Sequence, residues 1–114
     1  MESLNCKPYT LDINKREFSI GGQQVPLTSK EFELALHFFR HKDAVLSRKS
    51  LLEDVWGVTA DLRTRTVDAH VSRLRHKLQL SDSPWKISSI YKYGYCLHSA
   101  MRETGGVQKL QVSN

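Results

Sequence analysis

The feature that most constrains this chain is a single amphipathic segment near residues 63–79. Apolar residues recur there at the spacing of one face of an α-helix: Val67, Val71, Leu74 and Leu78. The pattern predicts a helix from about Arg63 to Gln79. Because a helix with one apolar stripe must bury that stripe against other elements, the rest of the chain has to supply a core around it.

A second helix is predicted to begin at Thr28. Thr28 and Glu31 have the spacing of a capping box, in which each side chain accepts a hydrogen bond from the other residue's backbone N–H. Leu27 and Phe32 stand at the two positions of a hydrophobic staple across that cap. The helical pattern then continues and fades at residues 41–43.

A shorter helix is predicted between Ser47, which can cap its first turn, and Gly57, which can end it. Residues 57–62 follow as a loop longer than the turn of a simple helix-turn-helix. Apolar residues whose spacing follows the predicted elements form the expected core: Phe32, Leu36, Phe39, Leu52, Val55, Trp56, Val67, Val71, Leu74, Leu78, Ile87, Ile90 and Leu97.

Strands are predicted on both sides of the helices. Between Tyr9 and Leu27 apolar residues tend to alternate, with interruptions at the polar residues 14–17 and at Gly21–Gly22. This pattern is typical of a short antiparallel meander. Near the C-terminus, residues 85–90 and 95–98 have the composition of two more strands joined by a tight turn.

The tip of this closing hairpin combines a cation with aromatic rings. Lys92 lies between Tyr91 and Tyr93, where its ammonium group could reach a phosphate backbone. Taken alone, the segment is better explained as a plain tight turn in which Gly94 supplies a positive φ.

The order of these elements predicts an α+β domain in which three helices pack against small antiparallel sheets. At 114 residues the chain has the length of one domain, which we expect to span residues 1–100, with a polar tail at 101–114. No apolar run approaches the roughly 20 residues of a membrane span, and no signal peptide is visible. Cys6 and Cys96 are expected to be reduced thiols of a cytoplasmic protein.

The positive charge of the chain is concentrated in residues 62–79, which include the predicted helix with the apolar stripe. The sequence holds 17 basic and 12 acidic residues, a net charge of +5. Residues 62–79 alone carry five Lys and Arg against the single Asp68, a net of +4. A modest overall excess is weak support for a polyanionic partner, but its position indicates which surface such a partner would meet.

The predicted helix has an outward face that lies more than about 90° from the apolar stripe. That face holds Arg65, Ala69, Ser72, Arg73 and His76. Asp68 and Arg75 flank the core instead, where neighbours can hold them. Arginine can donate two hydrogen bonds to guanine, and no carboxylate interrupts the face, which favours nucleic-acid binding. An ordinary solvated basic face is the alternative, and periodicity and charge alone favour it.

Several segments together resemble the winged-helix DNA-binding domain of OmpR/PhoB-type bacterial response regulators. The resemblance covers about Tyr9 to His98 and is carried by residues 27–34, 45–48, 51–57, 65–78 and 93–97. It implies a four-stranded N-terminal sheet, three helices and a C-terminal hairpin called the wing. It also implies that the third helix enters the major groove of double-stranded DNA while the wing approaches the minor groove.

The resemblance assigns roles by position. It implies base-facing positions at Ala69, Ser72, Arg73 and His76, phosphate contacts at Arg65, His70, Arg75 and Lys77, and a wing tip at Tyr91, Lys92 and Tyr93. It further implies head-to-tail homodimers on direct repeats, and contact with RNA polymerase through a loop at Val58, Thr59, Ala60 and Asp61.

Two departures from the family accompany these assignments. Many members have an Arg-Gly pair where this chain has Tyr91–Lys92, so Lys92 or Tyr91 must replace the wing arginine or that contact is lost. The 114 residues also leave no room for the receiver domain that usually precedes the output domain, which fits either an excised output domain or a standalone regulator.

Two other classes of function remain open from the residues. A winged helix can bind protein instead of DNA, with the aromatic wing tip and the 57–62 loop as contacts. An enzyme or zinc site would rely on the histidines, of which His37 and His41 lie four residues apart. That pair lacks the His-Glu-x-x-His pattern and an evident third ligand, so we expect no catalysis, no metal and no cofactor.

Overall fold

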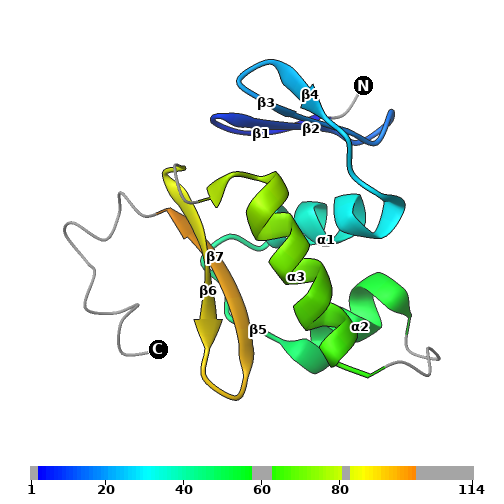
Figure 1. Cartoon of the computed structure of the whole chain (residues 1–114), viewed down its shortest axis with the longest axis vertical. Coiled ribbons are helices and arrows are strands. Elements are labelled where there is room, and N and C mark those ends of the chain that lie inside the picture. The colour runs from blue at the N-terminus through cyan, green and yellow to red at the C-terminus, as the bar shows by residue number, and fades with distance from the viewer. Residues whose placement is uncertain (1–2, 58–62, 81–82, 100–114) are drawn as a thin grey trace.

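The computed structural model describes residues 3–57, 63–80 and 83–99. The predicted α+β winged-helix architecture is confirmed, with two antiparallel sheets around three helices (Figure 1). In chain order the elements are β1 (Ser3–Cys6), β2 (Tyr9–Asp12), β3 (Glu17–Ile20), β4 (Gln23–Val25), α1 (Ser29–Arg40), β5 (Leu46–Ser47), α2 (Arg48–Trp56), α3 (Arg65–Lys77), β6 (Trp85–Ile90) and β7 (Gly94–Ser99).

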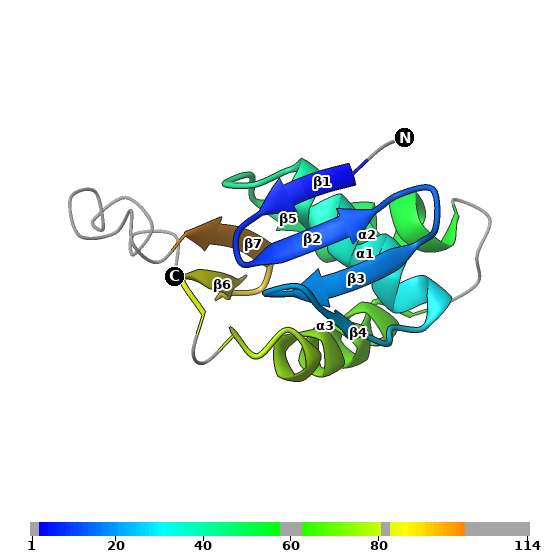
Figure 2. The ribbon, with the colours of Figure 1, turned by 90° about the horizontal axis from the view of Figure 1, so that it is seen from above.

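The N-terminal sheet covers one side of the helical layer, as the view from above shows (Figure 2). Its order is β1-β2-β3-β4, so consecutive strands pair throughout. Tyr9, Leu11 and Phe18 point into the core, and the rings of Tyr9 and Phe18 stack 5.5 Å apart. The alternation of residues 9–27 did not predict β1, because Cys6 is its only buried side chain, but the four strands implied by the resemblance are present.

The predicted helix starts are confirmed in atomic detail. The Thr28 hydroxyl accepts a hydrogen bond from the Glu31 N–H, and the Glu31 carboxylate accepts one from the Thr28 N–H at 2.9 Å. The Ser47 hydroxyl caps α2 in the same way through the Ser50 N–H, and Gly57 ends that helix at a φ of 110°. Helix α3 is shorter than predicted by two residues at each end.

The C-terminal sheet has the order β5-β7-β6 and includes a strand that the sequence pattern did not predict. Strand β5 pairs with the start of β7, Ser47 opposite Gly94. The expectation that Gly94 supplies the positive φ of the wing turn is wrong, because Lys92 adopts it, with a φ of 57°. Glycine is needed at 94 for space: an added Cβ would clash with the Leu46 carbonyl and lie 2.8 Å from the Ser47 Cα.

The core lies between the helices and the two sheets. Ten of the thirteen predicted core residues are buried, while Leu36, Trp56 and Ile90 are half-buried. Cys6 and Cys96 are buried free thiols, as expected. Within the described residues, no helix has both the length and the apolar character that a membrane span requires.

Candidate nucleic-acid interface

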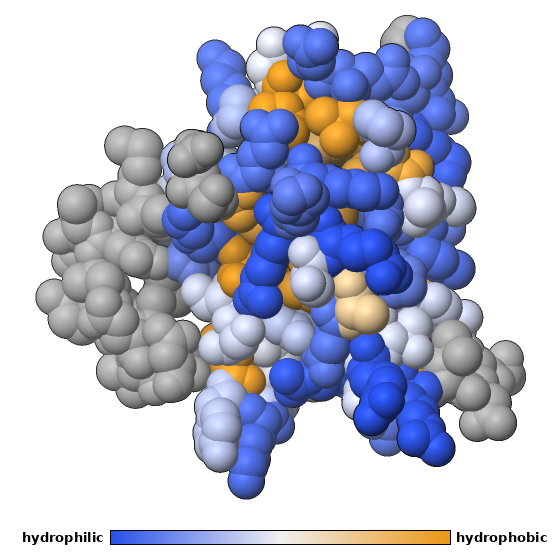
Figure 3. All heavy atoms as spheres, in the orientation of Figure 1, coloured by the Kyte–Doolittle hydropathy of each residue, from blue (hydrophilic) through white to orange (hydrophobic). Residues whose placement is uncertain are grey.

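The outward face of α3 is confirmed as solvent-exposed. Every residue assigned to it is open to solvent: Arg65, Ala69, Ser72, Arg73 and His76. The three buried residues of the helix, Val67, Val71 and Leu74, lie on the opposite side. In the space-filling view hydrophilic side chains dominate the surface over α3 and the tip of the wing, the β6–β7 hairpin (Figure 3). The face therefore offers two arginines, a histidine and small side chains to a ligand.

The side of α3 that faces the wing is occupied by contacts within the chain. Arg75 donates from Nε and Nη2 to the Ile87 carbonyl of β6, at 3.2 and 2.7 Å, and from Nη2 to the Ser89 hydroxyl at 2.9 Å. These hydrogen bonds cross from α3 to the wing and set the distance between them. The prediction that neighbours hold Arg75 is confirmed, and its guanidinium is largely committed to the wing.

Asp68 joins α2 and β7 to the same side of α3. Its Oδ1 accepts hydrogen bonds from Arg48 Nε at 2.8 Å and from the Tyr95 hydroxyl. Burial alone would raise the pKa of Asp68, but these two hydrogen bonds and the charge of Arg48 lower it below its ordinary value. The centre of the Tyr95 ring also lies 5.2 Å from the guanidinium carbon of Arg48 and 5.5 Å from that of Arg75, both cation–π distances. The wing is thus fastened to α3 by a continuous polar network.

A carboxylate from α1 reaches helix α3. Glu31 Oε1 accepts a hydrogen bond from Lys77 Nζ at 2.6 Å, and Oε2 lies 3.5 Å from Arg73 Nε. Burial would raise the pKa of Glu31, but the hydrogen bonds from Lys77 and Thr28 and the charges of Lys77 and Arg73 lower it. The sequence pattern indicates Glu31 only as a capping residue, because its two partners on α3 lie more than 40 residues away.

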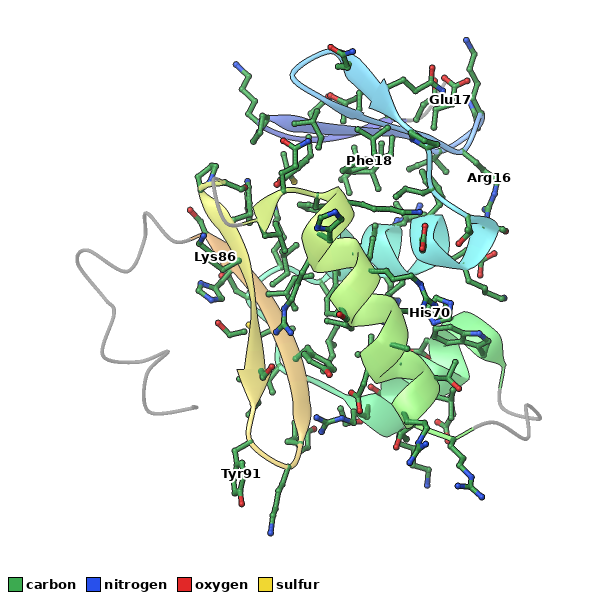
Figure 4. The ribbon with its side chains drawn as sticks, in the orientation of Figure 1. Arg16, Glu17, Phe18, His70, Lys86 and Tyr91 are labelled. Atoms are coloured by element: carbon green, nitrogen blue, oxygen red, sulfur yellow. The ribbon has the colours of Figure 1, made fainter. Side chains whose placement is uncertain are left out.

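His70 is oriented by its own helix and by α2. Its Nδ1 lies 2.8 Å from the Thr66 carbonyl, and its ring packs nearly perpendicular to that of Trp56 with ring centres 4.8 Å apart. Figure 4 labels His70 on α3. A carbonyl can only accept, so Nδ1 carries the proton. Arg73 Nη2, 3.3 Å from Nδ1, therefore finds no acceptor there. Nε2 is the nitrogen of His70 left for a ligand.

The wing tip carries the most exposed large apolar side chains of the described residues. Tyr91 is 77% exposed and Tyr93 is 50% exposed. Lys92 Nζ lies 5.4 Å from the centre of the Tyr91 ring, a cation–π distance. Figure 4 shows Tyr91 pointing away from the hairpin. The tip therefore presents a cation and two aromatic rings to whatever lies beyond it.

An open groove of about 630 Å³ runs between α3 and β6. Ser72 and His76 of the outward face form part of its wall, and Leu80 and Ile87 supply apolar surface. Lys86, labelled in Figure 4, donates to the Leu80 carbonyl at 2.5 Å. The groove is continuous with the outward face of α3 and belongs to the same surface.

Two other predicted features fall outside this surface. His37 and His41 lie with ring centres 4.4 Å apart, and His37 Nε2 is 3.4 Å from Asp54. Among the described residues no cluster of three or more potential ligands has a metal-binding arrangement. The loop assigned to RNA polymerase, Val58, Thr59, Ala60 and Asp61, lies outside the described residues.

Comparison with known proteins places the chain in a family. Residues 22–97 match the family model described as "Transcriptional regulatory protein, C terminal". The chain is 36% identical over 96 residues to the transcriptional regulatory protein PrrA of Mycobacterium tuberculosis, covering 84% of this chain and 41% of PrrA. It is 39% identical over 95 residues to the uncharacterized transcriptional regulatory protein YclJ of Bacillus subtilis, covering 82% and 41%. The chain thus spans about two fifths of the length of these relatives.

Solved structures of isolated domains match over nearly their whole length. The DNA-binding domain of Bacillus subtilis CssR has 38% identity and a TM-score of 0.69, with coverage of 78% of this chain and 98% of CssR. The DNA-binding domain of Klebsiella pneumoniae RstA, in complex with the RstA box, has 29% identity and a TM-score of 0.74, covering 86% and 98%. The chain belongs to the OmpR/PhoB-type family of C-terminal domains of transcriptional regulatory proteins.

Proposed function

We propose that this domain binds double-stranded DNA sequence-specifically as the output domain of a bacterial, cytoplasmic transcriptional regulator. The observation that carries the proposal is the exposed face of α3, which combines arginines with small residues and lies beside a wing tip bearing a lysine. Small side chains let a helix approach the floor of the major groove, and arginine supplies two donors to guanine. The RstA domain, whose fold this chain shares, was crystallised with its DNA box.

In this proposal the residues of the interface divide into those that contact bases and those that contact the DNA backbone. Ala69, Ser72, Arg73 and His76 face the bases in this proposal. Arg65 and His70, through Nε2, contact phosphates, and Lys92 contacts the backbone near the adjacent minor groove. Such phosphate contacts orient the protein without reading sequence.

The family resemblance also assigns Arg75 and Lys77 to phosphates, and their contacts modify that role. Arg75 donates to the wing and Lys77 donates to Glu31. We therefore assign Arg75 primarily to fixing the wing against α3, and Lys77 primarily to fixing α3 against α1. Their positive charges still contribute to the field that attracts DNA, because that attraction depends on position and not on direct contact.

The test is a selection of bound sequences from a random duplex pool. We expect one enriched motif, occurring as a direct repeat spaced near one helical turn, about 10–10.5 base pairs, if two copies bind head to tail. An enriched single motif would retain DNA recognition and overturn the dimer arrangement. Absence of any motif, together with no measurable binding to mixed duplex at low salt, would instead favour a protein-binding module that uses the exposed Tyr91 and Tyr93.

Contact with RNA polymerase is a separate part of the proposal, assigned to Val58, Thr59, Ala60 and Asp61. The measurement is transcription from a promoter that carries the selected site. Alanine replacements of Val58, Thr59 and Asp61 should abolish the regulatory effect while leaving DNA affinity unchanged. An unchanged regulatory effect would overturn the assignment.

A further inference from the structure

Glu31 is a buried carboxylate that lies against two basic side chains of another helix. Its side chain is only 2% exposed, although it lies on α1 and its two basic partners lie on α3. One oxygen, Oε1, accepts from the Thr28 N–H and from Lys77. The other, Oε2, faces Arg73 Nε at 3.5 Å. Each carboxylate oxygen thus serves a different part of the molecule.

The two cations on this carboxylate are held unequally. Lys77 Nζ is 2.6 Å from its oxygen, and the side chain is 33% exposed. Arg73 is 52% exposed, and its Nε is 3.5 Å from Oε2. Lys77 with the Thr28 N–H therefore keeps Glu31 Oε1 satisfied, while Oε2 faces Arg73 Nε and leaves the Arg73 side chain half-exposed. Because Glu31 is buried, its charge acts on Arg73 with less screening than an exposed carboxylate would experience.

The contact with Glu31 is made at Nε of Arg73, so the two Nη groups at the end of the guanidinium remain available to a ligand. An arginine has five N–H donors, one on Nε and four on the two Nη atoms. Glu31 faces Nε, and His70 Nδ1 near Nη2 already carries a proton. The Nη pair is the part of the guanidinium that can form two parallel hydrogen bonds to guanine O6 and N7.

We infer that Glu31 is a positioning residue for base recognition, which holds Arg73 by Nε so that its two Nη groups meet a guanine in the major groove. The inference rests on the proposed DNA-binding function. It adds the identity of one recognised base, a guanine, and the residue that orients Arg73 toward it. Glu31 also limits non-specific binding, because it keeps Arg73 from turning to the phosphates that every duplex offers. Holding a side chain in its bound conformation lowers the entropy cost of binding.

The decisive variant is Glu31→Gln in the whole chain. Glutamine serves in the capping box as glutamate does, so the start of α1 is retained. The variant removes the negative charge that faces Arg73. Thr28→Ala is the matched control, because it weakens the same cap and leaves the Glu31 carboxylate in place. Fluorescence anisotropy then gives the dissociation constant for the selected site and for a scrambled duplex over a range of salt concentrations.

The specificity ratio is the dissociation constant for the scrambled duplex divided by that for the selected site. We expect Glu31→Gln to reduce this ratio by about tenfold, within the range of one bidentate base contact. Binding to the scrambled duplex should become steeper in salt by about 0.9 in slope, the value of one added phosphate contact. Thr28→Ala should lower the melting temperature and leave both the ratio and the slope unchanged. A repeated selection with Glu31→Gln should lose its guanine preference at a single position.

A double mutant separates positioning from a general electrostatic effect. In an Arg73→Ala background, Glu31→Gln should change the ratio no further, because Glu31 acts through Arg73. An unchanged ratio in the single mutant, or the same change with and without Arg73, overturns the inference while DNA recognition stands. If the wild-type chain selects no motif, the proposed function and this inference both fail.

Discussion

The outward face of α3 and its wing-facing side use the same residue types for different purposes. Arg73 and Arg75 are two residues apart, yet Arg73 is 52% exposed and Arg75 makes three hydrogen bonds to the wing. The difference is set by what lies opposite each side chain: Arg73 has one Glu31 oxygen and solvent, and Arg75 has strand β6. We therefore expect mutations on the two faces to separate DNA binding from stability.

The largest effect is expected at the strand junction that anchors the wing. Gly94→Ala places a methyl group on the Leu46 carbonyl, and rigid backbone leaves it no space. We expect a loss of about 3 kcal/mol or more in the free energy of unfolding, measured by urea denaturation. Tyr93→Ala, one residue away and exposed, should change it by less than about 0.5 kcal/mol. Equal stability of Gly94→Ala and the wild type would contradict the close packing of β5 on β7.

A smaller effect is expected when the wing-facing contact itself is removed. Arg75→Ala leaves the Ile87 carbonyl and Ser89 without their donor and should cost about 2 kcal/mol of unfolding free energy. Arg65→Ala removes an exposed arginine from the same helix and should cost less than about 0.5 kcal/mol. Both are measured by urea denaturation. If the two variants were equally stable, the division of α3 into a structural and a free side would be wrong.

The smallest effect is expected from acid. The pKa of Asp68 is lower in the folded chain than its ordinary value of 3.8, so the unfolded chain binds its proton first as pH falls. Its stabilising contribution is therefore complete above that ordinary value and is lost as pH falls through the folded value. Glu31 behaves likewise below its ordinary value of 4.5. Between pH 5 and pH 3 the urea midpoint of Asp68→Asn should fall less steeply with pH than that of the wild type. An equally steep fall in both proteins would refute the contribution of the Asp68 carboxylate to stability.

Much of the fold could be predicted because its signals are local. The capping box of Thr28 and Glu31, the Ser47 cap and the stripe on α3 each depend on residues within a few positions of one another. The exposure of Arg65, Ala69, Ser72, Arg73 and His76 follows from the same helical geometry. The roles of these residues toward DNA stay predictions.

The features that sequence reasoning missed depend on distant pairing. Strand β5 has two residues and exists because β7 lies beside it. The adjacent turn predicts a positive φ at Gly94, whereas the Leu46 carbonyl that excludes a side chain there is 48 positions earlier in the sequence. Glu31 and Lys77 are separated by 46 residues. The capping box explains Glu31 locally, and the basic helix explains Lys77 locally. Neither residue therefore indicates from the sequence that the other is its partner.

The most direct test of the central claim, that the outward face of α3 reads DNA bases, is the effect of Arg73→Ala on two duplexes. Dissociation constants are measured by anisotropy for the selected site and for a scrambled duplex of equal length. We expect the selected site to weaken by about 10- to 100-fold, the scrambled duplex by no more than about threefold, and the melting temperature to stay unchanged. Equal weakening on both duplexes would contradict the account, because Arg73 would then contribute only its charge.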